Sequence, residues 1–250
     1  MHITAKNYAF EFLVGHEGLV LCMYMDVLGL ITTGAGNMID KDSGGGFAAV
    51  QTLVNEFNWY RIKDNVPATP AEVEAEWNNI KALTPKGHHL KMNGKIFEDW
   101  AKKQIPPLVT LQIKEDEFIK NVFPKKVEQF ENAIKKTPLD YFKDFDDFPA
   151  DAQLGILSVA WANGAYSAYD KKTRDGQTIA SFPLFRALCK EQDWRKIAAE
   201  KTYRWTNIND GRDIKTQKLF RNAANSFDKT KLIYPVIQIE MIEITGEASK

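Results

Sequence analysis

Apolar residues recur at helical spacing along most of this chain. Between residues 4 and 16 the spacing predicts a helix with Thr4 as its N-cap, and Gly18 is typical of a residue that ends a helix. Glu17 is therefore expected at the carboxyl end of the helix, where the helix dipole disfavours a negative charge. The inward face is expected to carry Ala5, Ala9, Phe12, Leu13 and His16.

A second helix is predicted over residues 69–83 from its starting signals. Thr69 stands at the N-cap position, Pro70 at the first helical position and Glu72 at the position that completes a capping box. These three residues satisfy the backbone groups that the first turn of a helix leaves open, so the start of this helix is sharply defined.

A long amphipathic helix is predicted over residues 114–136. Pro124 lies within it and predicts a kink or a break near Phe123, because proline cannot donate the backbone hydrogen bond of a helix. The strongly apolar segment 149–163 predicts a buried core helix, in which Trp161 packs in the interior. Further helices are predicted over residues 47–58, 181–200 and 211–226.

The pattern changes between residues 20 and 36. Short apolar pieces alternate there with glycines and the pair Thr32-Thr33, which predicts strands joined by tight turns. The last residues, 231–250, are rich in Ile and Val and are expected to form a strand or an extended tail. The whole pattern predicts an α+β fold that is mostly α, with its strands gathered near the N-terminus.

Composition narrows the classes of function. The chain has 250 residues, and 33 Lys and Arg balance 33 Asp and Glu, so we expect no nucleic-acid partner bound by a basic face. It has no run of about 20 apolar residues, and no signal-peptide pattern precedes the first predicted helix, so we expect no membrane span and synthesis in the cytoplasm.

We expect no metal and no organic cofactor, because the residues that usually bind one do not form a suitable pattern. Cys22 and Cys189 are too few for a disulfide scaffold or a zinc site of four cysteines, and they are expected to be small buried side chains. The neighbours His88 and His89 have no acidic or cysteine ligands at helical spacing around them.

Two carboxylates and a hydroxyl stand close together near the N-terminus. Glu17 and Asp26 are nine positions apart, and Thr32 follows six positions later. Glycoside hydrolysis uses such a pair, with one acid to protonate the leaving oxygen and one carboxylate to act on water or on the sugar cation. The position of Glu17 at the end of a helix fits the role of the general acid, which must hold a proton that it can donate. The three residue types alone also fit surface groups and turn formers.

A longer pattern surrounds these three residues. It reads EGxxLxxYxDxxGxxTxGxG from Glu17 to Gly36, and it resembles the phage-type lysozymes of glycoside hydrolase family 24, which include the T-even phage lysozymes. Three more blocks, which begin at Thr110, Asp151 and Arg204, resemble the lobe-connecting helix, the central core helix and the arginine-bearing segment of that family. The four blocks stand in the order of the family.

The resemblance implies a lysozyme-like fold of two lobes, with a small N-terminal β-hairpin region and a helical C-terminal lobe. It implies a catalytic domain over residues 1–230 and a C-terminal extension over residues 231–250. Within the domain it implies an enlarged insert or N-terminal lobe over 38–108, a lobe-connecting helix over 109–136 and a helical lobe over 137–230.

The resemblance also implies a role for each candidate residue. Glu17 becomes the general acid, Asp26 the carboxylate that activates water or stabilises the sugar cation, and Thr32 the group that orients the water. Arg212 supports catalysis by pairing with Glu17. The remaining candidates, for contacts with the substrate, are Tyr24 and Asn37, the latter at a position where the family often has His.

The implied function is that of a muramidase, which hydrolyses the β-1,4 bond between N-acetylmuramic acid and N-acetylglucosamine in peptidoglycan glycan strands. We expect a monomer that acts in the periplasm or cell wall, either as a phage endolysin or as an injected antibacterial effector or tail-associated lysozyme. The second setting adds an immunity protein or a delivery-apparatus component as partner, and the segment 38–108 favours it. The alternative is a catalytically inactive lysozyme-like module that binds the cell wall.

Overall fold

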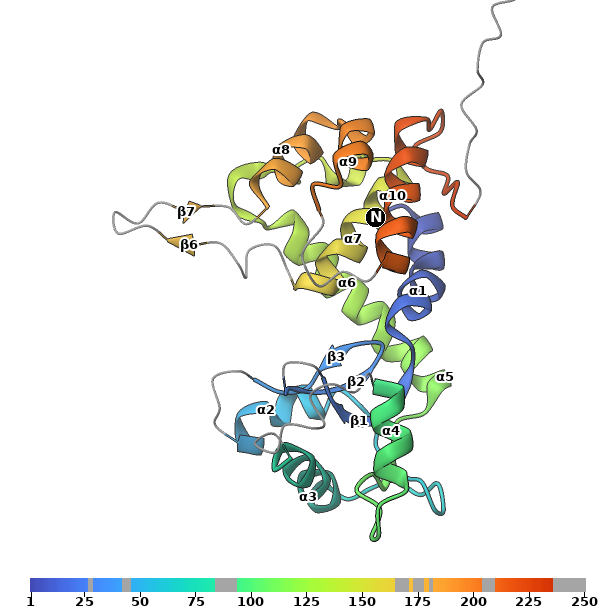
Figure 1. The fold of residues 1–250 in the computed structure, drawn as a ribbon, viewed down its shortest axis with the longest axis vertical. Helices are drawn as coiled ribbons and strands as arrows, with labels where there is room; N and C mark the ends of the chain where they lie inside the picture. Colours follow the sequence, from blue (N-terminus) through green and yellow to red (C-terminus); the bar gives the residue numbers. More distant parts are fainter. Residues whose placement is uncertain are drawn as a thin grey trace, which may run out of the picture. The chain divides into compact units, whose positions relative to one another are not determined.

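The computed structural model describes residues 1–26, 29–41, 46–83, 94–164, 171–172, 178–179, 182–203 and 210–235. The fold is mostly helical with small antiparallel sheets, as the hydrophobic pattern predicts (Figure 1). The strands are not confined to the N-terminal region, because residues 60–61 pair with 111–112 and residues 171–172 pair with 178–179. The chain divides into two compact units, one of residues 10–126 and one of residues 1–9 with 127–250. The predictions for His88, His89, Arg204 and the chain beyond residue 235 lie outside the described residues.

The unit of residues 10–126 is built around a three-stranded antiparallel sheet in the order β1-β2-β3. Two short strands, β4 and β5, pair separately. Its elements are the end of α1 (Ile3–Glu17), β1 (Val20–Met25), β2 (Ile31–Gly34), β3 (Asn37–Met38), α2 (Gly46–Val54), β4 (Tyr60–Arg61), α3 (Pro70–Lys81), α4 (Gly94–Lys102), β5 (Leu111–Gln112) and α5 (Glu115–Glu117).

Helices α3 and α4 pack against the sheet of this unit. The buried indole of Trp77 on α3 donates a hydrogen bond from Nε1 to the Ile39 carbonyl oxygen, at 3.1 Å. Gly94 lets α4 approach β1 closely, because a Cβ there would lie 2.8 Å from Cγ2 of Val20 and 3.0 Å from the ring of Tyr24. The sheet that carries the candidate site is therefore held by two helices distant in sequence.

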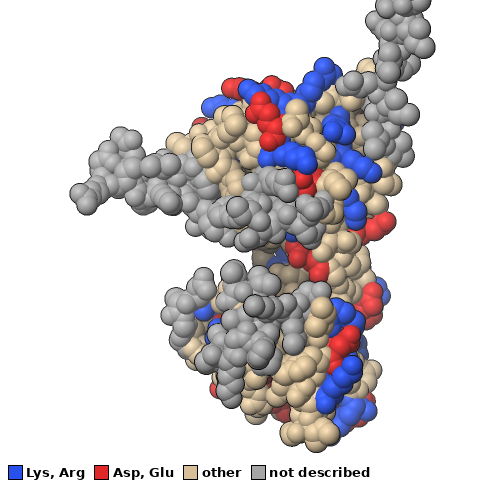
Figure 2. Space-filling view, in the orientation of Figure 1, with Lys and Arg blue, Asp and Glu red and all other residues tan. Residues whose placement is uncertain are grey.

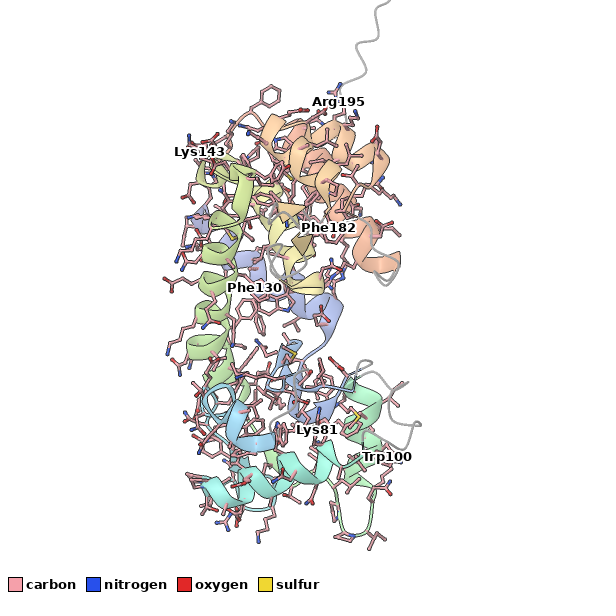
Figure 3. All side chains as sticks on the ribbon, turned by 90° about the vertical axis from the view of Figure 1, so that its left-hand side faces the viewer. Lys81, Trp100, Phe130, Lys143, Phe182 and Arg195 are labelled. Carbon is pink, nitrogen blue, oxygen red and sulfur yellow. The ribbon has the colours of Figure 1, made fainter. Side chains whose placement is uncertain are left out.

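The other unit is a helical assembly in which α10 packs on α7 and α9 (Figure 1). The apolar helix α7 is buried as predicted, and its Trp161 stacks on Phe130, which is labelled in Figure 3, with ring centroids 4.9 Å apart. The elements are α6 (Phe123–Lys135, shared with the first unit), α7 (Ala150–Asn163), β6 (Lys171–Lys172), β7 (Thr178–Ile179), α8 (Pro183–Glu191), α9 (Trp194–Glu200) and α10 (Asp210–Ala224).

The capping and proline signals predict local structure correctly. Thr69 caps α3 and forms the full capping box with Glu72. The long helix changes type at Phe123, as expected from Pro124: a π-helical turn over Phe118–Val122 separates α5 from α6. The wider turn places the Phe123 amide on the Phe118 carbonyl, directly before the residue that has no amide to donate.

Three helix boundaries were predicted wrongly. Thr4 is not an N-cap, because α1 begins at Ile3 and the Thr4 hydroxyl donates instead to the Thr230 carbonyl, at 2.6 Å. The helix predicted over 47–58 ends at Val54. The segment 181–200 forms two helices, because the chain is left-handed at Gln192 and Asp193 then caps α9 by accepting from the Lys196 amide.

Candidate functional site

Glu17 is the last residue of α1, as predicted. The Gly18 amide donates to the Val14 carbonyl at 2.8 Å, and the positive φ of Gly18, 72°, turns the chain out of the helix toward β1. The Glu17 side chain reaches the turn between β2 and β3, where a Cβ on Gly36 would lie 3.5 Å from Glu17 Cδ and 3.6 Å from Oε2. The carboxyl group therefore lies against a backbone position that has no side chain.

Asp26 follows β1 directly and is fixed by the backbone across the hairpin. Its carboxylate Oδ1 accepts a hydrogen bond from the Leu30 amide at 2.9 Å, and its own amide donates to the Leu30 carbonyl at 2.8 Å. The Gly29 amide closes the turn by donating to the Asp26 carbonyl, at 3.0 Å. The half-buried carboxylate is thus held by the backbone of the turn.

Thr32 lies on β2, where its side chain is buried. Its hydroxyl contacts the Leu30 carbonyl at 3.4 Å, a long hydrogen bond. The prediction of strands and tight turns over residues 20–36 is therefore confirmed, and it brings Thr32 and Asp26 to the backbone of one residue, Leu30.

Tyr24 connects the three candidate residues. The register places Tyr24 opposite Thr32, and Asp26 is two positions beyond Tyr24, so strand alternation puts these side chains on one face of the hairpin. Burial raises the pKa of Tyr24, and the nearby negative charges of Glu17 and Asp26 raise it further. Both carboxylates therefore lie near enough to act electrostatically on the same tyrosine, which is 8% exposed.

Asn37 lies on a different face from these residues. It pairs with Thr33 across the turn, and alternation places it away from the side chain of Thr32. Its Oδ1 atom is buried, has no hydrogen-bond partner among the described residues, and would lie 3.0 Å from a Cβ on Gly34. A contact of Asn37 with substrate stays a prediction.

Arg212 lies in the first turn of α10 and is buried within the helical unit. Its neighbour Asp213 is also buried and forms an ion pair with Lys201, with 2.7 Å between Nζ and Oδ2. Glu17 belongs to the other compact unit, and the pairing of Arg212 with Glu17 stays a prediction.

The sequence does not reveal an ion pair beside the hairpin, between the buried carboxylate of Asp40 and the partly exposed Lys81. Asp40 is 2% exposed, and its carboxylate accepts from the amides of Ile31 at 3.0 Å and Lys41 at 2.7 Å. Lys81, at the end of α3 and labelled in Figure 3, places Nζ 2.6 Å from Asp40 Oδ2 and 3.4 Å from the Gly29 carbonyl. This helix therefore fixes both the Asp26 turn and the start of β2.

The residue types that bind metals do not cluster in the described part of the chain. No three or more His, Cys, Asp or Glu side chains come together there in a way that could hold an ion. Both cysteines are buried free thiols, as predicted, and burial raises the pKa of each. Within the same residues no helix is long and apolar enough to span a membrane.

Comparison with known proteins adds no assignment. No model of a known protein family matches this chain, and no curated protein matches it in sequence.

Proposed function

We propose that this protein is a muramidase, which hydrolyses the β-1,4 bond between N-acetylmuramic acid and N-acetylglucosamine in bacterial peptidoglycan. The observation that carries the proposal is the common location of the three residues near Tyr24: Thr32 lies opposite it on the hairpin, Asp26 directly follows the strand of Tyr24, and Glu17 and Asp26 both raise its pKa. Two carboxyl groups in one place are what glycoside hydrolysis usually requires, and the hydroxyl of Thr32 adds a group that can orient water.

The proposed roles follow from how each side chain is held. Glu17 is the general acid, because the end of α1 and the β2–β3 turn hold its carboxyl group against the backbone of Gly36. Asp26 is the base or the stabiliser of the sugar cation, because the Leu30 amide donates to one carboxylate oxygen and so fixes the orientation of the group. Thr32 orients the attacking water.

The proposal includes two features taken from the resemblance to the phage-type lysozymes. One is a lysozyme-like fold of two lobes in which Arg212 supports Glu17. The other is inversion of configuration, which requires a water between sugar and base and carboxyl groups about 6.5–9.5 Å apart. The biological setting proposed is a phage endolysin or an injected effector, with the segment 38–108 as the addition that favours delivery by a larger assembly.

Replacement of the acid tests the proposal. We expect Glu17→Gln to remain folded and to clear purified cell-wall suspensions about 10²–10⁴ times more slowly, because the amide cannot protonate the leaving oxygen. Glu74→Gln, on the exposed face of α3, is the matched control and should clear at the wild-type rate. Mass spectrometry of the products should show saccharides that end in intact reducing muramic acid.

Three results would contradict the proposal in different ways. Wild-type clearing by Glu17→Gln would remove Glu17 as the acid. Binding of cell wall without any clearing by the unmodified protein would favour an inactive binding module. Products that end in anhydro-muramic acid would indicate a lytic transglycosylase, in which no water enters the reaction.

A further inference from the structure

A pocket of about 340 Å³ lies within the unit of residues 10–126, between α2, β4 and the start of α3. None of the three candidate catalytic residues lines it. Its volume falls within the range of about 300–1,000 Å³ that is usual for small-ligand sites. The pocket therefore has the size of a binding site in its own right, apart from the proposed reaction.

The pocket combines an aromatic floor with an amide rim. The floor consists of the buried side chains of Phe47, Phe57 and Trp59. The rim includes the exposed side chains of Gln51, on α2, and Asn55, the residue directly after the end of this helix. An apolar floor with a few polar groups at its edge is the usual form of a site that binds a small ligand.

The amide groups on this rim are open to a ligand. The side chains of Gln51 and Asn55 form no hydrogen bond with any described residue, and each offers a donor and an acceptor. Asn58 stands beside them, and its Nδ2 donates to Glu117 Oε2 at 3.0 Å, which fixes the orientation of its amide. The rim thus pairs best with a ligand that carries both N–H and C=O or hydroxyl groups.

The lining of the pocket is uncharged throughout. The adjoining groove of about 240 Å³ shares Phe57 and Asn58 with it but carries Glu56, Lys114 and Glu117 on its walls. Since charged residues make up 26% of the chain, a wholly neutral lining is a local property of this pocket. It favours a neutral ligand over a nucleotide or an anionic peptide.

Hydrogen bonds within the protein fix the walls of the pocket in the absence of a ligand. The Trp59 indole donates from Nε1 to the Val54 carbonyl at 3.1 Å, which ties the floor to the end of α2. The Ala68 amide donates to the Trp59 carbonyl at 2.8 Å, and the capping box at Thr69 starts α3 directly afterwards. A preformed pocket loses less conformational entropy on binding than a mobile one.

We propose that this pocket binds an N-acetylated sugar unit of the glycan strand, at a second site apart from the catalytic residues. The acetamido methyl group and the apolar face of the sugar lie on the aromatic floor, and the acetamido N–H and C=O pair with the rim amides. The inference rests on the proposed function, since the muramidase assignment identifies the glycan.

The test uses a soluble tetramer of N-acetylglucosamine and the Glu17→Gln chain, which does not consume it. Binding is followed by the NMR signal of the Trp59 indole N–H, which reports on the pocket floor and is assigned by Trp59→Phe. The double variant Gln51→Ala/Asn55→Ala should bind about tenfold more weakly, because two hydrogen bonds are lost. Thr52→Ala, on the same helix and outside the lining, should bind like the parent.

An unchanged affinity in the double variant, or an indole signal that never moves, overturns the inference. So does equal binding of a glucose tetramer, which lacks the acetamido group and should bind at least tenfold more weakly. These failures leave the muramidase proposal intact, because that proposal depends on clearing of cell walls by the chain with Glu17. Loss of clearing by Gln51→Ala/Asn55→Ala in the chain that keeps Glu17, with unchanged cleavage of a soluble glycan fragment that contains N-acetylmuramic acid, would support the second site alone.

Discussion

At the scale of single residues, Gly36 controls how closely the β2–β3 turn approaches the proposed acid. Its φ is 77°, and a Cβ there would touch the carboxyl carbon of Glu17 at 3.5 Å. We expect Gly36→Ala to lower the free energy of unfolding by about 1–2 kcal/mol through left-handed backbone strain. The new methyl group would lie in ordinary van der Waals contact with the Glu17 carboxyl, and we expect it to slow clearing of cell walls severalfold, because it takes space beside the proposed acid.

Gly46 supplies the control for this substitution. It has a similar φ of 64°, but a Cβ there meets no atom within 4 Å. Gly46→Ala should therefore lower the free energy of unfolding, measured in urea, by about as much as Gly36→Ala does. It should leave the clearing rate unchanged. Equal losses of activity in the two variants would show that strain, and not contact with Glu17, governs the effect.

The ion pair between Lys81 and Asp40 gives a second prediction at this scale. Lys81→Met keeps an unbranched apolar side chain but removes the ammonium group, which leaves the buried Asp40 carboxylate without this cation. We expect the free energy of unfolding, measured in urea, to fall by about 2 kcal/mol. The loss is smaller than for a fully buried pair because Lys81 is partly exposed.

A second substitution tests the cause of that loss. Asp40→Asn, added to Lys81→Met, should recover part of the stability because no charge is then buried alone. Lys103→Met removes an exposed lysine and should change the unfolding free energy little. If the Asp40 substitution deepens the loss in the Lys81→Met chain, the carboxylate contributes mainly through the Ile31 and Lys41 amides.

The sequence predicts the contacts of the site that are short-range along the chain better than those that join residues far apart in sequence. The helix end at Glu17 and the hairpin that holds Asp26 and Thr32 follow from short-range signals, a glycine after a helix and glycines between apolar pieces. The contact between Asp40 and Lys81 joins residues 41 positions apart. Many acidic and basic residues could form such a pair, and only the packing of α3 on the sheet selects these two.

At the scale of elements, the predictions succeed where a helix carries its own boundary signals. The capping box of α3 and the proline after the π-helical turn are local chemistry, and both are confirmed. Helix α4 was missed because it lies in a segment interrupted by prolines and begins with Gly94. The segment 181–200 is not one helix, because Asp193, a residue type that strongly favours the N-cap position, starts α9 within it.

Glu76 joins two elements and should make stability depend on pH. Its Oε2 accepts from the amides of Thr110 and Leu111 and from the Thr110 hydroxyl, which ties α3 to the segment at β5. Burial raises the pKa of Glu76 from 4.5 to about 7, against the opposing effect of these hydrogen bonds. The folded protein therefore holds a proton on Glu76 at pH values where the unfolded chain has lost it.

The sign of the effect follows from this difference in protonation. The contribution of Glu76 to stability is fully present below about pH 4.5 and is lost as pH rises through about 7, a change of about 3 kcal/mol. We expect Glu76→Gln to remove this part of the pH dependence in urea unfolding, because the amide does not titrate. Glu74→Gln, on the same helix but exposed, should keep the wild-type slope. Parallel curves for all three chains would contradict the assignment to Glu76.

At the scale of the whole molecule, positive and negative side chains are equal in number and are interspersed on the surface. The formal net charge is zero, and Lys and Arg alternate with Asp and Glu over the described part of the face in Figure 2. Long-range attraction to a charged partner requires an excess of one sign. Encounter with the cell wall should therefore depend on contacts at short range and not on electrostatic steering.

Activity should accordingly depend little on salt. We expect the rate of wall clearing to change less than about twofold between about 0.01 and 0.15 M ionic strength, although the screening length falls from about 30 to 8 Å. The double variant Glu74→Lys/Glu128→Lys changes two exposed positions and moves the net charge about four units positive, so its clearing of a wall that carries peptide carboxylates should fall as salt rises. A steep salt dependence in the unmodified protein would instead indicate that a local cluster of charge, despite the overall balance, brings it to the wall.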